Sequence, residues 1–183
     1  MMNPLQRIIC RHCNAAEEQD NMGDRLLEYA RFVLAHMRER RTTSNGTERY
    51  YSQIPHTAAN VLQHMAKTAA DPRGDNLRNY SDKRGKHQRT CWYYASNENT
   101  IKALWGVTPD DEKMYRGRWQ ALQRAYGILV KHGLIARASR ASPGHQTTFD
   151  LLPLVSTYLE MHKVIDELDS WSNQQNDMPT KSA

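Results

Sequence analysis

The clearest pattern in the sequence is an amphipathic stripe between residues 113 and 131, and any fold of this chain must bury one side of it. Apolar side chains recur there at steps of four, three, four and three residues, the spacing of one helix face: Tyr115, Trp119, Leu122, Tyr126 and Leu129. At about 100° per residue, the far side carries polar side chains within an arc of about 80°: Lys113, Arg116, Gln120, Arg124 and Lys131. The pattern predicts a helix that is apolar on one side and basic on the other.

This helix is bounded by start and stop signals. Thr108 and Pro109 supply a hydroxyl N-cap and a proline for the first helical position, and Asp110 and Asp111 add negative charge to the first turn. Gly133 is placed to end the helix, because glycine readily adopts the left-handed backbone found at helix C-termini. We therefore expect a long helix between Pro109 and Gly133.

A β-hairpin is predicted directly after this helix. Residues 135–140 have the composition of a strand, residues 141–145 read Ala-Ser-Pro-Gly-His and predict a turn, and residues 146–152 predict the returning strand. The basic side chains near the tip of this hairpin are Arg137, Arg140 and His145.

Two shorter helices are predicted upstream of the long one. Residues 56–70 follow a proline and carry apolar side chains at helical spacing. Ser96 is placed to cap a short helix over residues 97–105, which Gly106 ends.

Between these two helices lie a long loop and a short strand. Residues 71–90 are rich in glycine, proline and charge, so they predict a basic loop. Residues 91–94 read Cys-Trp-Tyr-Tyr and have strand character. We expect their aromatic side chains, and those of Tyr50 and Tyr51, to lie in the core, with stacking on single-stranded bases as the alternative.

Helices are also predicted on either side of this central region. Residues 23–41 and 154–172 carry apolar faces at helical spacing. Arg38, Arg40 and Arg41 would then lie in the last turn of the first helix, where cations favour the helix dipole. The predicted divisions are an N-terminal helical extension over 1–48, a central domain over 49–153, a C-terminal helix over 154–172 and a disordered tail over 173–183.

The order of elements from residue 55 to residue 152 resembles a winged helix-turn-helix domain. The closest match is the run Gln-Arg-Ala-Tyr-Gly-Ile-Leu-Val-Lys-His-Gly-Leu-Ile over residues 123–135, which is similar to the end of a recognition helix in that superfamily. Residues 136–152 then resemble the wing. About ten extra residues between Val107 and Trp119 depart from the usual pattern, which leaves open which side chains would reach bases. The resemblance covers roughly half the chain and implies a mainly α-helical protein: a winged-helix core of three helices and a β-hairpin, with additional N- and C-terminal helices.

The charge distribution agrees with a nucleic-acid partner. The net charge of 25 − 20 = +5 is modest, but residues 112–146 carry seven basic side chains and one acid, a local +6. An α-helix fits the major groove of DNA, about 12 Å wide, where Arg recognises guanine and Gln recognises adenine. The side chains that we expect to contact double-stranded DNA are Lys113, Arg116, Arg118, Gln120, Arg124, Arg137, Arg140 and His145.

The sequence therefore predicts a non-enzymatic protein that binds double-stranded DNA, as a transcriptional regulator or as a replication or accessory factor of a plasmid or phage. A basic helix face is also what an ordinary solvated surface presents. The alternative function is therefore a protein–protein adaptor on the same scaffold, without DNA binding. A third hypothesis is an enzyme whose site lies in residues 71–90.

Other features mainly exclude functions. The chain has no Gly-x-x-x-x-Gly-Lys loop and no His-Glu-x-x-His helix, so we expect neither a catalytic site nor a cofactor. Cys10 and Cys13 form a Cys-x-x-Cys pair without a second pair, which predicts free thiols rather than a zinc site. The sequence shows neither a membrane span nor a signal-peptide pattern near its N-terminus, so we expect a cytoplasmic location. The apolar faces of the outer helices, 23–41 and 154–172, would either pack on the domain or pair two subunits in a possible homodimer.

Overall fold

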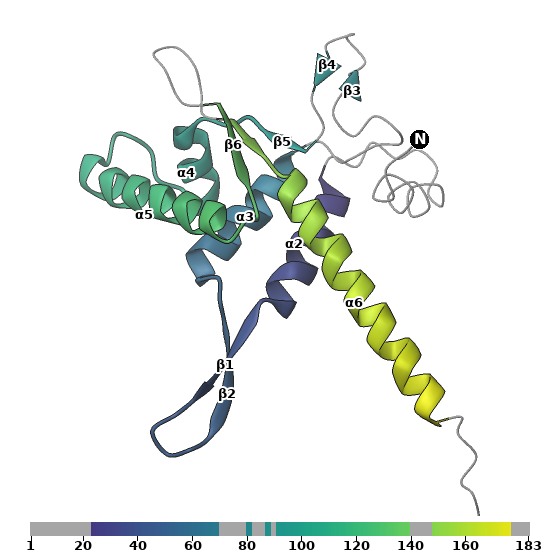
Figure 1. The fold of residues 1–183 in the computed structure, drawn as a ribbon. Coiled ribbons are helices and arrows are strands. Elements are labelled where there is room, and N and C mark those ends of the chain that lie inside the picture. The colour runs from purple at the N-terminus through teal and green to yellow at the C-terminus, as the bar shows by residue number, and fades with distance from the viewer. Residues whose placement is uncertain (1–22, 70–79, 82–86, 89–90, 140–147, 177–183) are drawn as a thin grey trace, which may run out of the picture.

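The computed structural model (Figure 1) describes residues 23–69, 80–81, 87–88, 91–139 and 148–176. Within these residues the protein is mainly helical, with a small antiparallel sheet. The helices are α2 (Asp24–His36), α3 (His56–Thr68), α4 (Asn97–Trp105), α5 (Glu112–Lys131) and α6 (Leu152–Asn176). The strands are β1 (Arg38–Thr42), β2 (Glu48–Ser52), β3 (Tyr80–Ser81), β4 (His87–Gln88), β5 (Trp92–Tyr93), β6 (Ala136–Ser139) and β7 (Thr148–Asp150).

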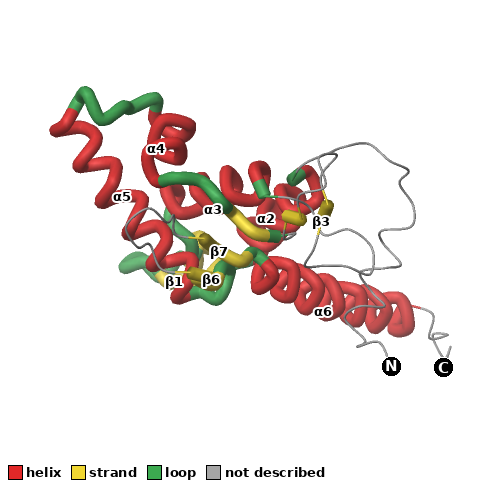
Figure 2. Tube along the Cα trace, turned by 90° about the horizontal axis from the view of Figure 1, so that it is seen from above, coloured by secondary structure: helices red, strands yellow, loops and turns green. Residues whose placement is uncertain are grey.

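One hydrophobic core joins all five described helices to the three-stranded sheet. Helix α3 lies at its centre, because it packs against α2 on one side and against α5 on the other. Helix α2 also packs against the first half of α6, where the rings of Tyr29 and Tyr158 stack with their centroids 4.1 Å apart. Figure 2 shows α6 running out past this contact, away from the other helices.

The central sheet has the strand order β5-β7-β6, and both pairings are antiparallel. The middle strand β7 places Phe149 between Tyr93 on β5 and Arg137 on β6. Phe149 is buried, and its ring lies 4.4 Å from that of Tyr126 on α5, centroid to centroid. The sheet is thereby fixed to the second half of α5.

A buried hydroxyl group connects α4 to β5. The Oγ1 atom of Thr100 donates to the carbonyl oxygen of Ser96 at 2.9 Å and lies 2.5 Å from the Tyr93 hydroxyl. A threonine hydroxyl has one proton and two lone pairs, so Thr100 can donate to Ser96 and accept from Tyr93 at the same time. Burial raises the pKa of Tyr93 to about 12, and burial together with the nearby Tyr93 raises the pKa of Tyr126.

Several predicted elements are confirmed. Ser96 caps α4, accepting the backbone N–H of Asn99 at 3.1 Å, and Gly106 ends the helix with a φ of 67°. The long helix, the hairpin strands and the strand at Trp92 and Tyr93 all form, although β6 and β7 are shorter than predicted.

The predicted helix over 23–41 is wrong beyond His36. The backbone leaves the helix at Met37, and Arg38, Arg40 and Arg41 lie on strand β1 rather than in a last helical turn. Residues 38–42 contain no apolar side chain that could extend the buried face of α2, so nothing holds them in a helix. They pair instead with β2, from Arg38 opposite Ser52 to Thr42 opposite Glu48.

The residues between β1 and β2 form a hairpin turn and not only a helix-ending loop. The N–H of Thr43 donates to the carbonyl of Thr47, and that of Gly46 donates to the carbonyl of Thr43, both at 2.9 Å. The predicted burial of Tyr50 and Tyr51 on β2 is also wrong, since 67% and 39% of their surfaces are exposed.

Three further boundaries differ from expectation. Asp111, not Thr108, is the N-cap of α5, because its carboxylate accepts the N–H of Met114 at 3.2 Å. Helix α6 begins one residue before Pro153, where the Asp150 carboxylate accepts the N–H of Leu152 at 2.8 Å. It continues to Asn176, so the first four residues of the predicted disordered tail are helical.

The predicted loop over 71–90 lies mostly outside the described residues. Its described part is the pairing of β3 with β4, with Tyr80 opposite Gln88. In the described part of the chain, no helix is long and apolar enough to cross a membrane.

Gly23 and Gly46 provide a matched test of how closely α2 packs on α3. Both have nearly the same left-handed backbone, with φ of 78° and 77°. An added Cβ at Gly23 would overlap the carbonyl oxygen of Lys67 on α3, whereas one at Gly46 would meet nothing within 4 Å. We predict that Gly46→Ala costs at most the backbone strain of about 1–2 kcal/mol, and that Gly23→Ala costs at least twice as much. Urea unfolding measures the free energy of unfolding of both variants. Equal losses of stability in the two variants would contradict the close contact between α2 and α3.

Thr100→Val tests the buried hydroxyl. Valine has nearly the same shape but leaves the Tyr93 hydroxyl buried without its acceptor. We predict a loss of about 1–3 kcal/mol in the free energy of unfolding, the cost of one unpaired buried group. Adding Tyr93→Phe should recover most of that loss, because it removes the stranded donor. A Thr100→Val protein as stable as the original would show that the Tyr93 hydroxyl does not depend on Thr100.

Candidate nucleic-acid interface

The two halves of α5 differ in burial. The second half packs into the core through Leu122, Ala125, Tyr126 and Leu129. The first half, residues 112–121, contains no buried side chain. In Figures 1 and 2 these first turns lie at the outer edge of the molecule, on the side away from α6. The sequence placed Trp119 in the buried stripe, but 44% of its surface is exposed. Helical spacing assigns Trp119 to the core side, where Tyr115 packs partly buried against the core, but spacing does not say how completely a side chain is covered.

The polar face of α5 is exposed along its whole length. Its charged and amide side chains follow the predicted arc, and all of them are exposed: Lys113, Arg116, Gln120, Arg124 and Lys131. Their common face lies opposite the four buried residues. Because the second half of the helix is fixed in the core, this arc has a defined orientation relative to the rest of the protein.

Arg118 does not belong to that arc. At about 100° per residue it lies about 140° around the helix from Lys113. Its guanidinium carbon is 5.6 Å from the centre of the Trp105 ring on α4, within the range of a cation–π contact. We assign Arg118 to the junction between α4 and α5 rather than to the basic arc.

Two glycines, Gly117 and Gly127, lie on the same exposed face as the arc, and sequence reasoning missed them. A Cβ at either position would meet nothing within 4 Å, and neither has a positive φ. No packing or backbone constraint in the described structure therefore requires glycine, although each weakens the helix by about 1 kcal/mol relative to alanine. The available signal was the presence of glycine in the interior of the longest basic helix. Glycine at such positions lets another molecule approach the backbone closely.

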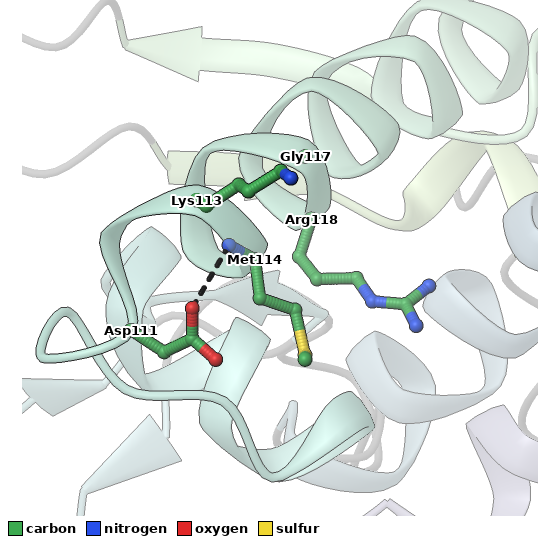
Figure 3. Close-up of a pocket in the computed structure, with 5 residues that line it drawn as sticks. All are labelled: Asp111, Lys113, Met114, Gly117 and Arg118. Atoms are coloured by element: carbon green, nitrogen blue, oxygen red, sulfur yellow. Dashed lines mark hydrogen bonds between the residues drawn. The ribbon is translucent and has the colours of Figure 1, made fainter.

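An open hollow of about 670 Å³ lies at the first turns of α5 (Figure 3). It is lined by Asp111, Lys113, Met114, Gly117 and Arg118. The Asp111 carboxylate is already used in capping the helix, as the dashed line in Figure 3 shows. The hollow is therefore bordered by two cations, by the capping carboxylate, by the Met114 side chain and by a residue without a side chain.

The predicted hairpin residues are only partly described. Arg137 is exposed on β6, directly opposite the buried Phe149 of β7. Arg140 and His145 lie outside the described residues. Arg137 is thus the one hairpin cation of the predicted set that the structure describes, on a strand that shares its sheet with β5.

The described residues contain no group of three or more His, Cys, Asp or Glu side chains that could hold a metal ion. Cys10 and Cys13 lie outside these residues, and Cys91 is buried and forms no disulfide with another described residue. Among the histidines, His64 has a lowered pKa because of burial and because Lys67 is near. The centroid of this half-buried ring on α3 lies 6.0 Å from that of Tyr93, so His64 does not belong to the exposed arc of α5.

Comparisons with known proteins add no assignment. No protein-family model matches the chain, and searches of curated proteins and of solved structures returned no match.

Proposed function

We propose that residues from α3 to β7 form a winged helix that binds double-stranded DNA, with α5 in the major groove. The observation that carries this proposal is the exposed basic arc of α5, held in place by the burial of the opposite side of the same helix. A helix that enters a groove needs both properties, since its polar face must reach the bases while its apolar face stays fixed to the protein.

The order of elements supports the winged-helix part of the proposal. Helix α3 is followed by strand β5, helices α4 and α5, and the hairpin β6–β7. Strand β5 pairs with β7, which joins the segment before α4 to the hairpin after α5. This is the order in which the sequence resembles the superfamily, and the resulting sheet packs on α5 through Phe149. Because one fold serves many functions, the DNA-binding part rests on the basic arc and not on the topology.

A protein–protein adaptor is the second candidate, and it is favoured by the exposed apolar side chains of α5. Trp119 and Met114 have 44% and 49% of their surfaces exposed. Aromatic residues and methionine are enriched in protein interfaces. The two candidates differ in salt dependence, since binding through phosphate contacts weakens steeply as salt is added.

We further propose that a homodimer would pair through α6 and not through α2. The apolar face of α2 is already used, because Leu26, Ala30 and Val33 are fully buried against the rest of the core. Val164 and Leu168 on the outer part of α6 remain 54% and 62% exposed, and they are the apolar residues available for a second copy. A dimer of this kind would suit a two-fold symmetric DNA site.

DNA binding is tested with a labelled random-sequence duplex of 30 base pairs, by fluorescence anisotropy between 50 and 200 mM salt. We predict salt-sensitive binding that Arg116→Ala/Arg124→Ala weakens at least tenfold at low salt. The matched control is Arg31→Ala/Lys67→Ala, which removes the same charge from exposed positions on α2 and α3. Equal losses of affinity in the α5 variant and in the control would show that binding depends on the total charge and not on the position of the arginines. Absence of binding by the folded protein at 50 mM salt would overturn the proposal and favour the adaptor.

Two substitutions at Gly117 separate the contribution of α5 to the stability of the protein from its contribution to DNA binding. We predict that Gly117→Ala raises the free energy of unfolding by up to about 1 kcal/mol, because alanine favours the helix and its Cβ has open space. Gly117→Leu should keep the protein folded but weaken DNA binding at least tenfold, because its side chain would hold the helix away from the groove. Unfolding and anisotropy are measured on the same samples. Unchanged affinity in the leucine variant would place the DNA away from this part of α5.

A further inference from the structure

The hairpin formed by β1, its turn and β2, residues 38–52, projects from the helices as a two-stranded ribbon (Figure 1). We call it the arm. None of its side chains is buried, and the core resumes only at Ile54. The arm therefore contributes nothing to the hydrophobic core, and the winged-helix proposal does not use it. A ribbon without a buried face is only marginally stable by itself, so its presence calls for another explanation.

The strand register defines the two faces of the arm. Directly opposed residues share a face, and successive residues alternate between faces. One face carries Arg38, Arg40, Thr42, Glu48, Tyr50 and Ser52, and the other carries Glu39, Arg41, Arg49 and Tyr51. The strands thus hold four arginines against two glutamates, and each face has a net charge of +1.

The charges of the arm are not arranged for its own stability. Arg41 and Arg49 are direct cross-strand partners, and like charges in that position destabilise a hairpin. Arg41 has partial compensation, because it pairs with Glu39 and lies 5.5 Å from the centre of the Tyr51 ring. Arg49 has no ion-pair partner among the described residues, and the same holds for Arg38. An anion bound between Arg41 and Arg49 would relieve the repulsion between these two side chains.

The exposed tyrosines indicate the same kind of partner. Tyr50 faces Arg40 across the strands, and 67% of its surface is exposed. Arginine and tyrosine side chains both donate hydrogen bonds to phosphate oxygens. A two-stranded ribbon also has dimensions that the major groove admits.

A second copy of the chain fits the arm less well. Two arms pairing edge to edge would bring their arginines together, and charged side chains are a common means of preventing such pairing. Each strand of five residues spans roughly 16 Å at about 3.3 Å per residue. The arm can therefore reach a segment of duplex beyond the helices, where phosphate charges are closely spaced along the axis.

We propose that the arm is a second DNA contact, which binds the phosphate backbone of double-stranded DNA through Arg41 and Arg49, the opposed pair on one of its faces. This inference rests on the proposed function for the identity of the ligand, but not for the residues that bind it.

The test is Arg41→Thr/Arg49→Thr, measured on the 30-base-pair duplex against salt. Threonine favours strands, and a cross-strand Thr–Thr pair replaces the repelling one, so the hairpin should be at least as stable as before. We expect binding to weaken at least tenfold at 50 mM salt. Each lost phosphate contact lowers the slope of log affinity against log salt by about 0.9, so the slope should fall by nearly 2. Arg31→Ala/Lys67→Ala is again the charge-matched control.

Combining these changes with Arg116→Ala/Arg124→Ala separates the two proposals. If both contacts exist and are independent, the combined variant should lose affinity by the product of the factors by which the two double variants lose it. Wild-type affinity and slope in the arm variant would overturn the arm contact while leaving α5 intact. A loss in the arm variant alone would support the arm and overturn the role of α5. Absence of DNA binding by the original protein overturns both proposals. If the arm variant changes sedimentation but not affinity, the arm contact with DNA is overturned and the proposal for α5 is unaffected.

Discussion

The hydroxyl of Thr100 is the interaction on which the arrangement of the central region depends. Thr100 is fully buried, and among the described residues it is the polar side chain that the core encloses. By accepting from Tyr93 it ties α4 to the sheet, where Phe149, the cross-strand neighbour of Tyr93, packs on Tyr126 of α5. Apolar contacts alone would allow α5 to rotate or slide by small amounts at little cost, whereas a buried hydrogen bond has a specific geometry. The direction of the basic arc of α5 is therefore set from inside the protein.

The candidate interface lies on a helix whose two halves differ in burial. The second half of α5 carries the four buried residues, and Tyr126 among them packs on Phe149 of the sheet. The first half has no buried side chain and carries the first three polar residues of the arc, together with Gly117 and the hollow beside it. The extra residues that set the sequence apart from the winged-helix pattern it resembles fall in and just before this first half.

What the sequence predicts well is what depends on local spacing. Caps and helical periodicity act over a few residues, so the sequence alone could identify Ser96, Gly106 and buried positions of α5 from Leu122 onward. The position of Trp119 shows the limit, since periodicity says which side a residue faces but not how completely its side chain is covered. The arm shows a second limit: residues 38–41 continue a helix-compatible composition, and only pairing with residues 49–52 makes them a strand. The start of α5 involves several competing capping groups within four residues, and the sequence alone does not rank them.

The site was predicted to a similar extent and for the same reasons. The arc from Lys113 to Lys131 follows from helix geometry alone, so its members could be named in advance. Arg118 was included because of its charge, and the contact with Trp105 that removes it depends on how α4 packs. Gly117 and Gly127 carry no charge and belong to no motif. Their significance appears only once the structure shows that nothing surrounds them.

The place where the arm joins the core has a consequence for how this chain can change. The arm leaves α2 at Met37 and returns at Gln53, whose N–H donates to the Met37 carbonyl at 3.0 Å. Helices α2 and α3 are antiparallel neighbours, since the start of α2 touches the end of α3, so a tight turn at this hydrogen bond would connect them equally well. The arm could thus be lengthened, shortened or replaced without removing a buried side chain from the core. Its sequence is not held to the demands of packing, whereas the helices on either side are.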